Sequence, residues 1–262
     1  MNLSLSNKHA VVCGSSQGLG LAAAIELASL GAHCILMARN SESLEKAVRS
    51  LPNDGTQKHA YKVADFTNID AVYAAIQEIS AENNIEILVN NTGGPKAGLI
   101  TDASSEDFVQ AFQQHLVNNR NLVNTVLPGM KAAGYGRIIN IISTSVKTPL
   151  PNLGVSNTVR AAVAAWAKSL SNEIGQFNIT VNNVLPGLTA TARLTSLISG
   201  TAASLQQSIQ TVEQGMISSI PMRRFGDASE IANVIAFLAS PAASYVTGVS
   251  IQVDGGRTPT LS

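Results

Sequence analysis

The stretch Cys13-Gly14-Ser15-Ser16-Gln17-Gly18-Leu19-Gly20 decides which fold this sequence predicts. It follows residues 9–13, an apolar run rich in valine that is typical of a strand buried on both faces of a parallel sheet. From Gly18 to residue 30 the apolar positions have helical spacing, and Gly31 then ends the helix. A second apolar run, 34–38, completes a strand–helix–strand unit.

The three glycines of this turn have separate tasks in such a unit. Gly14 permits a tight turn, Gly18 lets backbone N–H groups approach a pyrophosphate, and Gly20 lets the helix pack on the sheet. The helix N-terminus adds partial positive charge. The pattern therefore predicts a dinucleotide-binding turn, with a merely structural glycine-rich turn as the alternative. The residues expected to contact the cofactor here are Gly14, Ser15, Ser16, Gln17, Gly18, Leu19 and Gly20.

Composition points to a small-molecule partner. The 262 residues carry 17 basic and 17 acidic side chains, so no electrostatic footprint for nucleic acid or an anionic membrane is visible. No apolar run reaches about eighteen residues, and residues 1–8 lack a signal-peptide pattern, which predicts a soluble, cytoplasmic protein. Cys13 and Cys34 fall in expected buried strands, where a thiol behaves as a small hydrophobe, and no metal site is expected.

Strand and helix alternate along the whole chain. Further strands are expected at 59–64, 85–89, 137–142, 179–185 and 249–253, and helices at 41–50, 68–82, 105–133, 157–176 and 229–239. Seven strands joined mostly by helices predict an α/β fold, a Rossmann-type doubly wound parallel sheet with helices on both faces. Because no linker interrupts the chain, residues 1–262 are expected to form a single domain.

Ligands of such sheets bind beyond the carboxyl ends of the strands, where the strand order reverses. Polar or turn-forming residues follow the expected strands at Arg39, Asp65, Asn90 with Asn91, Ser143, and Pro186-Gly187. These residues are therefore expected to line one edge of the sheet.

Five motifs occur in order along the chain. They are Gly14-x3-Gly18-x-Gly20, Asn90-Asn91-Thr92-Gly93, Ser143, Pro186-Gly187 and Val253-Asp254-Gly255-Gly256. Together they resemble the short-chain dehydrogenase/reductase family over essentially the whole chain, and are most similar to members described as 3-oxoacyl-(acyl-carrier-protein) reductases. The resemblance implies a nicotinamide dinucleotide as cofactor and a carbonyl or alcohol as substrate.

Arg39 bears on which dinucleotide is bound. An acidic residue about twenty positions after the glycine turn binds the ribose 2′-hydroxyl of NAD, whereas a basic residue accommodates the extra phosphate of NADP. Arg39 occupies this position and Ala38 before it is uncharged, so NADP(H) is favoured and NAD(H) is the alternative. An ordinary solvated arginine at a strand end would look the same, and Gln17 supplies no second charge.

The resemblance implies further cofactor contacts. Asp65 and Phe66 would flank the adenine, and Asn91 to Gly93 would line the adenosine ribose. Thr189 and Thr191 would contact the nicotinamide carboxamide. Asp65 and Thr191 would suit helix or turn caps equally well.

The catalytic positions depart from the family's pattern. Members use Ser, then Tyr thirteen residues later and Lys four beyond, with an Asn from the preceding long helix. Here Ser143 matches, but the same spacing gives Ser156 and Arg160, and the Asn position holds His115. A Tyr phenol has a pKa near ~10 that neighbouring positive charge lowers, whereas an alkyl hydroxyl is a far weaker acid. Arg160 stays protonated, but can bind ribose hydroxyls or a carboxylate in a fork geometry.

His115 is the only replacement expected to titrate near neutral pH, so it is the candidate that supplies or relays a proton while Ser143 holds the substrate oxygen. The four tyrosines, Tyr61, Tyr73, Tyr135 and Tyr245, lie far from the altered position in sequence. Plainer explanations exist: His115 would suit a subunit interface, and Ser156 and Arg160 would suit a protein that has lost turnover. The alternative function is therefore a catalytically silent NAD(P)-binding protein, acting as a sensor or a partner subunit.

Residues 188–220 have no strand pattern but carry spaced apolar residues, which predicts a helical lid over the substrate. These apolar residues favour a hydrophobic substrate, and core packing explains them almost equally well. On the helix at 157–176, family members form dimer and tetramer contacts, so a homo-oligomer (dimer or tetramer) is expected. The residues placed there are Ala161, Ala164, Ala165 and Trp166.

Overall fold

The computed structural model describes residues 1–261. Its centre is a seven-stranded, entirely parallel sheet in the order β3-β2-β1-β4-β5-β6-β7. The order reverses between β1 and β4, so the predicted doubly wound fold is confirmed. The strands are β1 (His9–Cys13), β2 (His33–Ala38), β3 (Ala60–Val63), β4 (Ile85–Asn90), β5 (Gly136–Ile141), β6 (Ile179–Pro186) and β7 (Ser250–Val253).

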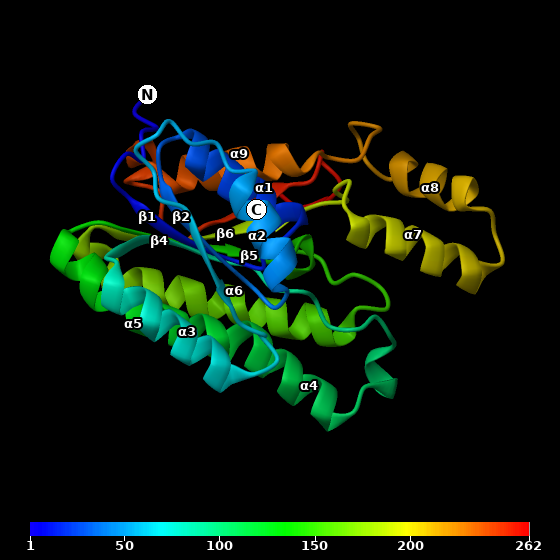
Figure 1. Cartoon of the computed structure of the whole chain (residues 1–262). Coiled ribbons are helices and arrows are strands. Elements are labelled where there is room, and N and C mark those ends of the chain that lie inside the picture. Colours follow the sequence, from blue (N-terminus) through cyan, green and yellow to red (C-terminus); the bar gives the residue numbers. More distant parts are fainter. Residues whose placement is uncertain (262) are drawn as a thin grey trace.

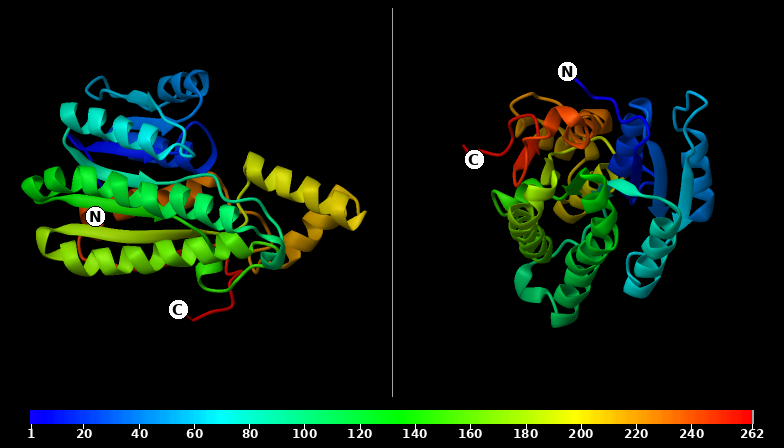
Figure 2. Two further views of the ribbon diagram at one scale, coloured as in Figure 1. Left: turned by 90° about the horizontal axis from the view of Figure 1, so that it is seen from below. Right: turned by 90° about the vertical axis from the view of Figure 1, so that its left-hand side faces the viewer.

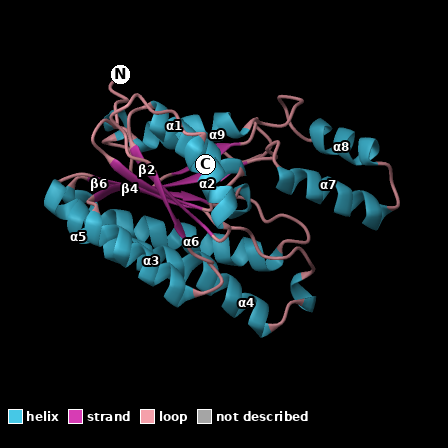
Figure 3. Ribbon diagram, in the orientation of Figure 1, coloured by secondary structure: helices cyan, strands magenta, loops and turns pink. Residues whose placement is uncertain are grey.

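Helices cover both faces of the sheet, as Figure 1 and Figure 3 show. One face carries α1 (Gly18–Ser29), α2 (Ser41–Arg49) and α9 (Ala228–Ala239), and the other carries α3 (Ile69–Glu82), α5 (Asn118–Ala133) and α6 (Gly154–Ile174). Strand side chains alternate between two apolar cores: Val12 packs with the α1 side, and its neighbours Val11 and Cys13 pack with the α3 side. Both faces of β1 are therefore buried, as its apolar run predicted.

Residues 105–133 do not form the single helix that the sequence predicted. α4 (Ser105–Phe112) is followed by a π-helical turn, η2 (Gln113–Val117), and then by α5. A π-turn closes its hydrogen bonds over one residue more than an α-helix, which bulges the backbone, and such turns are frequent at functional sites. Hydrophobic spacing alone does not reveal this extra residue. His115 lies at the centre of the turn.

The helix after β5 also begins earlier than predicted, at Gly154 instead of 157. The reason is that Asn157 lies inside the helix, where its side chain accepts from the backbone N–H of Leu150 and donates to its carbonyl. Ser156 and Arg160 are consequently both on α6.

A row of buried amides crosses the core of the sheet. Asn90, Asn140 and Asn183 stand opposite one another on β4, β5 and β6. Nδ2 of Asn90 donates to Oδ1 of Asn140, and Nδ2 of Asn140 donates to Oδ1 of Asn183, both at 2.9 Å. The row ends at Ser250 on β7, whose Oγ accepts from Asn183 at 3.1 Å. Because a slip of one residue would turn these side chains to the other face, the row holds four strands in register.

After β6 the chain forms two helices that project beyond the end of the sheet, as Figure 2 shows. α7 (Ala192–Leu205) and α8 (Ile209–Ser218) pack on each other through Leu194, Ile198 and Val212. They occupy most of the segment that the sequence predicted to be helical, and their role as a lid stays a prediction. No helix within residues 1–261 is both long and apolar enough to cross a bilayer.

Candidate active site

The glycine turn between β1 and α1 is closed by contacts that only glycine permits. Gly14 has φ +57°, and a Cβ there would lie 2.6 Å from the carbonyl oxygen of Asn91. A Cβ on Gly20 would lie 2.3 Å from the carbonyl oxygen of Gly14, so the first turn of α1 rests directly on the loop. The tasks predicted for Gly14 and Gly20 therefore match the packing.

Two polar side chains hold this turn in place. Nδ2 of Asn91 lies 3.3 Å and 3.1 Å from the carbonyl oxygens of Cys13 and Gly14. Ser15 is fully buried; its Oγ donates to Val12 and accepts from the N–H of Met37. The side chain of Ser15 is thus used within the protein, and its predicted contact with the cofactor stays a prediction for its backbone.

The space over Gly18 suits a pyrophosphate. A Cβ on Gly18 would meet only Cγ2 of Thr191, at 3.9 Å. α1 has no acidic residue in its first turn, and Gln17 at its N-cap makes no side-chain capping bond. The backbone N–H groups from Gly18 to Gly20, together with the helix dipole, therefore face this space without a competing anion. The residues present fit a dinucleotide.

Arg39 and Asp65 lie where the adenosine end of such a cofactor would bind. Arg39 follows β2 and is exposed, with no ion pair among the described residues. Oδ1 of Asp65 accepts from the backbone N–H and the hydroxyl of Thr67, both at 2.9 Å. These bonds, and then the charge of Arg39, hold the pKa of Asp65 below its usual range. Asp65 thus caps its own turn, the alternative that the sequence left open.

The side chains of the motif after β4 (90–93) point to different parts of the protein. Asn90 belongs to the amide row of the core, so its side chain is used within the sheet, and its predicted contact with the cofactor stays a prediction for its backbone. Thr92 instead turns to the long helical segment, where its Oγ1 lies 2.6 Å from Nδ1 of His115. No atom lies within 4 Å of a Cβ placed on Gly93, so this residue is open to a ligand. Phe66 is half-buried, and its carbonyl accepts from Nδ2 of Asn118 at 2.9 Å.

His115 is 4% exposed, and the bond to Thr92 uses only one of its ring nitrogens. Nε2 is buried and has no partner among the described residues. A histidine so enclosed within its own chain does not fit the alternative of an interface residue. Burial, and then the charges of Arg160 and Arg193, lower the pKa of His115 to about 3. The expectation that His115 titrates near neutral pH is therefore wrong for this site, and the ring is neutral at pH 7.

Arg160 enters the same region from α6, which packs against the π-turn. It is 8% exposed, and its Nη1 donates to the carbonyl of Ile141 at 3.0 Å. Burial and the charge of Arg193 lower its pKa to about 10, so Arg160 stays charged at neutral pH. Ile141 is the last residue of β5 and precedes Ser143 by two residues, so this bond brings Arg160 to the carboxyl end of that strand.

Arg193 was not singled out by the sequence patterns. It lies in the first turn of α7, and its Nη2 is only 2.5 Å from the position of a Cβ on Gly94. The signal that could have found it is composition, because Arg193 is the only basic residue in 188–220.

The remaining predicted residues lie around this edge. Oγ of Ser143 accepts from the N–H of Ser145 at 3.1 Å, which leaves its own proton to donate. Ser156 is buried on α6. A Cβ placed on Gly187 would lie 2.6 Å from the Cα of Asp254. This close packing holds Pro186-Gly187 against the chain that follows β7. Thr189 donates to Gly187, and Thr191 donates to Thr189.

The four tyrosines lie outside α6 and the turn after β5, which carry Ser143, Ser156 and Arg160. Tyr61, Tyr73 and Tyr245 are exposed, and the hydroxyl of Tyr135 donates to Ala239 at 2.7 Å. Both cysteines are buried and free, as expected, and burial raises the pKa of each thiol to about 12.

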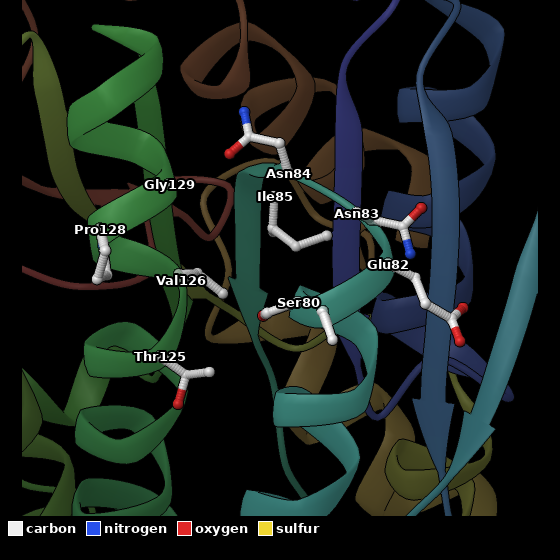
Figure 4. Close-up of a pocket in the computed structure, with 10 residues that line it drawn as sticks. Ser80, Glu82, Asn83, Asn84, Ile85, Thr125, Val126, Pro128 and Gly129 are labelled. Carbon is white, nitrogen blue, oxygen red and sulfur yellow. The ribbon is translucent and has the colours of Figure 1, made fainter.

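A pocket of about 390 Å³ lies away from these residues, between the end of α3 and the helix α5. Figure 4 shows Ser80, Asn84 and Thr125 at its wall, beside Ile85 at the amino end of β4. Ligands of doubly wound sheets bind at the carboxyl ends of strands, so this pocket is not the candidate active site.

Comparison with known proteins matches nearly the whole chain. Residues 14–258 match the family model described as Enoyl-(Acyl carrier protein) reductase. The 3-oxoacyl-[acyl-carrier-protein] reductase FabG of Pseudomonas aeruginosa is 34% identical over 97% of this chain and 98% of its own. The NADPH-dependent reductase BacG of Bacillus subtilis is 32% identical over 98% of this chain and 100% of its own. The structure of L-sorbose reductase from Gluconobacter frateurii, complexed with NADPH and L-sorbose, has a TM-score of 0.93 and 32% identity, with 100% of both chains covered.

Proposed function

Because this chain belongs to the short-chain dehydrogenase/reductase family, we propose that it is an NADP(H)-dependent reductase of a carbonyl, or dehydrogenase of the corresponding alcohol. One observation carries this proposal: the glycine turn is intact and the space over Gly18 is open to a pyrophosphate. The names of the relatives BacG and L-sorbose reductase, and the position of Arg39, both favour NADP(H). The predicted similarity to 3-oxoacyl reductases agrees with the match to FabG.

We propose that the active site is atypical, with Ser156 and Arg160 where relatives carry Tyr and Lys. The nicotinamide cofactor, when bound, supplies or accepts the hydride. Ser143 then holds the carbonyl oxygen, since its hydroxyl accepts from Ser145 and has its proton free to donate. Charge developing on that oxygen must be met by a proton, and Ser156 is a poor acid.

A neutral His115 can pass on this proton without becoming charged. In the tautomer that carries hydrogen on Nε2, Nδ1 accepts from the hydroxyl of Thr92, 2.6 Å away. Nε2 gives its proton to the substrate oxygen while Nδ1 takes the proton of Thr92. The hydroxyl of Thr92 is half-buried and takes a proton from solvent in the same step, so that no threonine alkoxide is formed. Thus the low pKa of His115 favours a relay over donation from an imidazolium.

The segment 188–220 would act as the lid of this site, because Arg193 on α7 already reaches Gly94 after β4. Exposed apolar residues on both sides support a partly hydrophobic substrate. They are Leu197, Leu205 and Ile209 on the α7–α8 segment, and Leu99, Ile100 and Phe112 on the segment 99–112 that follows β4. A homo-oligomer is proposed as the active form. The outer side of α6 carries the small, exposed residues Ala161 and Ala165, which let a second copy approach closely.

Matched variants test the reductase and its proton route together. We expect NADPH oxidation with a ketone substrate to fall at least roughly a hundred-fold in Ser143→Ala, the cost of losing one oxyanion donor. The rate of NADPH oxidation should fall roughly a hundred-fold in His115→Asn, because the relay is lost. The rate should fall less in Thr92→Val and least in Ser156→Ala. NADPH binding, followed by fluorescence, should be unchanged in all four. Tight NADPH binding without turnover of any carbonyl by the unaltered protein would instead support the catalytically silent alternative.

A further inference from the structure

Arg160 is a buried charge with most of its donors unused. A guanidinium offers five N–H donors, and within residues 1–261 only the bond from Nη1 to Ile141 is made. No ion pair of the described chain includes Arg160. Burying a charge without an opposite charge is costly, so such a group usually has a partner. None of the described residues supplies that partner, so an anion from outside the chain can fill this role.

Arg193 brings a second unpaired guanidinium to the same place. It reaches from α7 to Gly94, two residues beyond Thr92, and it too makes no ion pair among the described residues. Its charge and that of Arg160 both act on His115, and its charge also acts on Arg160. Two like charges from different elements thus converge with no carboxylate between them.

His115 supplies an independent observation. The residue is only 4% exposed, and its Nδ1 is bonded to Thr92. Its Nε2 is buried and has no partner among the described residues. A buried polar atom of this kind is normally satisfied, either within the protein or by a ligand. The unpartnered Nε2, the guanidinium of buried Arg160 and the guanidinium of exposed Arg193 lie around one site.

We propose that the substrate carries a carboxylate, and that this group binds to Arg160 and Arg193 beside Nε2 of His115. The proposal rests on the function proposed above and makes the substrate an oxo acid or hydroxy acid. A carboxylate has two oxygens that match the paired donors of a guanidinium, so one anion can satisfy both arginines. Its carbonyl is then held within reach of Ser143 and His115.

The phosphates of the cofactor are the other anions that reach this edge of the sheet. The pyrophosphate space over Gly18 is bordered by Thr191, whereas Arg160 is tied to Ile141 at the end of β5. Arg160 therefore belongs to the part of the site that holds the reacting carbonyl. Arg193, two residues after Thr191, lies between the two regions, and the experiment separates these roles.

A bound carboxylate would also change the charge state of His115. The charged groups that act on it are Arg160 from α6 and Arg193 from α7, and the described residues place no carboxylate there. An anion between the two arginines offsets their charge, so the pKa of His115 rises towards its usual value. His115 is therefore easier to protonate when a substrate carboxylate is bound than when the site holds none.

The experiment compares two small ketones, the anion pyruvate and its uncharged methyl ester, methyl pyruvate. Their binding to the protein with NADP⁺ is measured by calorimetry at low salt, so no turnover is required. We expect pyruvate to bind at least roughly ten-fold more tightly, and Arg193→Gln to remove roughly ten-fold of that affinity while leaving methyl pyruvate unchanged. Arg193→Lys should recover part of the loss. Arg49→Gln, which removes an exposed charge paired with Glu45 on α2, is the matched control.

Imidazole NMR of the unaltered protein gives a second readout, which requires no arginine variant. Pyruvate should raise the pKa of the His115 resonance, identified by its loss in His115→Asn, and methyl pyruvate should not. Equal affinity for the two ketones, or saturation by neither, would overturn the proposal even if the protein proved to be a reductase. A loss of NADP⁺ affinity in Arg193→Gln with an unchanged preference for pyruvate would assign this arginine to the cofactor and also overturn it.

Discussion

At His115 the surroundings decide the charge state more than the imidazole itself does. A free histidine titrates near pH ~6.5, but this ring is enclosed and flanked by two arginines, which lower its pKa to about 3. The bond to Thr92 fixes one ring nitrogen and leaves the other for a ligand. The residue is therefore suited to transfer protons while neutral.

The depressed pKa of His115 has a consequence for stability against acid. The unfolded chain binds a proton at this residue below pH ~6.5 while the folded chain does not, so the stabilising effect is present above pH ~6.5 and is lost as pH falls towards ~3. Between pH ~7 and pH ~5 we expect this residue to account for about 2 kcal/mol of lost unfolding free energy.

Urea unfolding of the unaltered protein and His115→Asn at both pH values measures this difference. His9→Asn is the comparison, because burial and then the charge of His33 also lower the pKa of His9, at the amino end of β1 and away from Thr92 and the two arginines. An equal acid loss in His115→Asn and in the unaltered protein would show that His115 is protonated in the folded state.

Arg39 is expected to set the preference between cofactors. Its charge would contact the 2′-phosphate of NADPH, and a charge-assisted bond of this kind corresponds to at least roughly ten-fold in affinity. Arg39→Asp should weaken NADPH by that factor and leave or improve NADH. Fluorescence titration of both cofactors at fixed salt checks this. Equal affinities in the unaltered protein would rule out this role of Arg39.

Motif spacing located most of the candidate site but not the orientation of each side chain. The positions of Gly14, Gly18 and Gly20 follow from a local turn, which sequence specifies directly. Asn90 and Ser15 look like ligand contacts by spacing, yet their side chains are used inside the protein. Arg193 depends on how α7 returns to the sheet, and no local pattern encodes that contact.

At the scale of elements, the row of amides on β4, β5 and β6, which ends at Ser250 on β7, is expected to lose stability through a single substitution. Asn140 lies in its middle and bonds on both sides. Replacing it by an apolar residue leaves a buried donor on Asn90 and a buried acceptor on Asn183 unsatisfied.

Asn140→Leu should therefore lower the free energy of unfolding by about 3 kcal/mol, from two unsatisfied groups and a larger side chain in a packed core. Asn233→Leu, at an exposed position on α9, should change it by less than about 0.5 kcal/mol. Urea denaturation of both variants provides the comparison. Similar values for the two would mean that the row contributes no net stability.

The order and type of the elements were predictable because buried strands and amphipathic helices have distinct periods. The ends of β2 and β4 moved by one residue, which such periods do not fix. The break at 113–117 was missed for a physical reason: a π-turn keeps helical composition and changes only the hydrogen-bond spacing.

At the scale of the whole molecule, the outer side of α6 is the surface expected to pair with another copy. Ala161 and Ala165 are exposed and Trp166 is half-buried there. Ala165→Glu should place an unpaired charge in the contact and shift a dimer or tetramer towards monomer. Sedimentation at micromolar concentration checks it, with Ala74→Glu on the exposed side of α3 as control. A monomeric unaltered protein would exclude the expected assembly.

The π-turn finally makes the helical segment from α4 to α5 read as a helix with one residue inserted. Each residue turns an α-helix by about 100°, so removing one residue within 113–117 would restore regular winding and rotate α4 relative to α5. Because the bulge takes up the extra residue locally, the shortened chain should keep α4, α5 and the fold in place but carry His115 or its replacement away from Thr92. A deletion of one residue at this bulge is therefore expected to leave a stable protein that lacks the proposed active site.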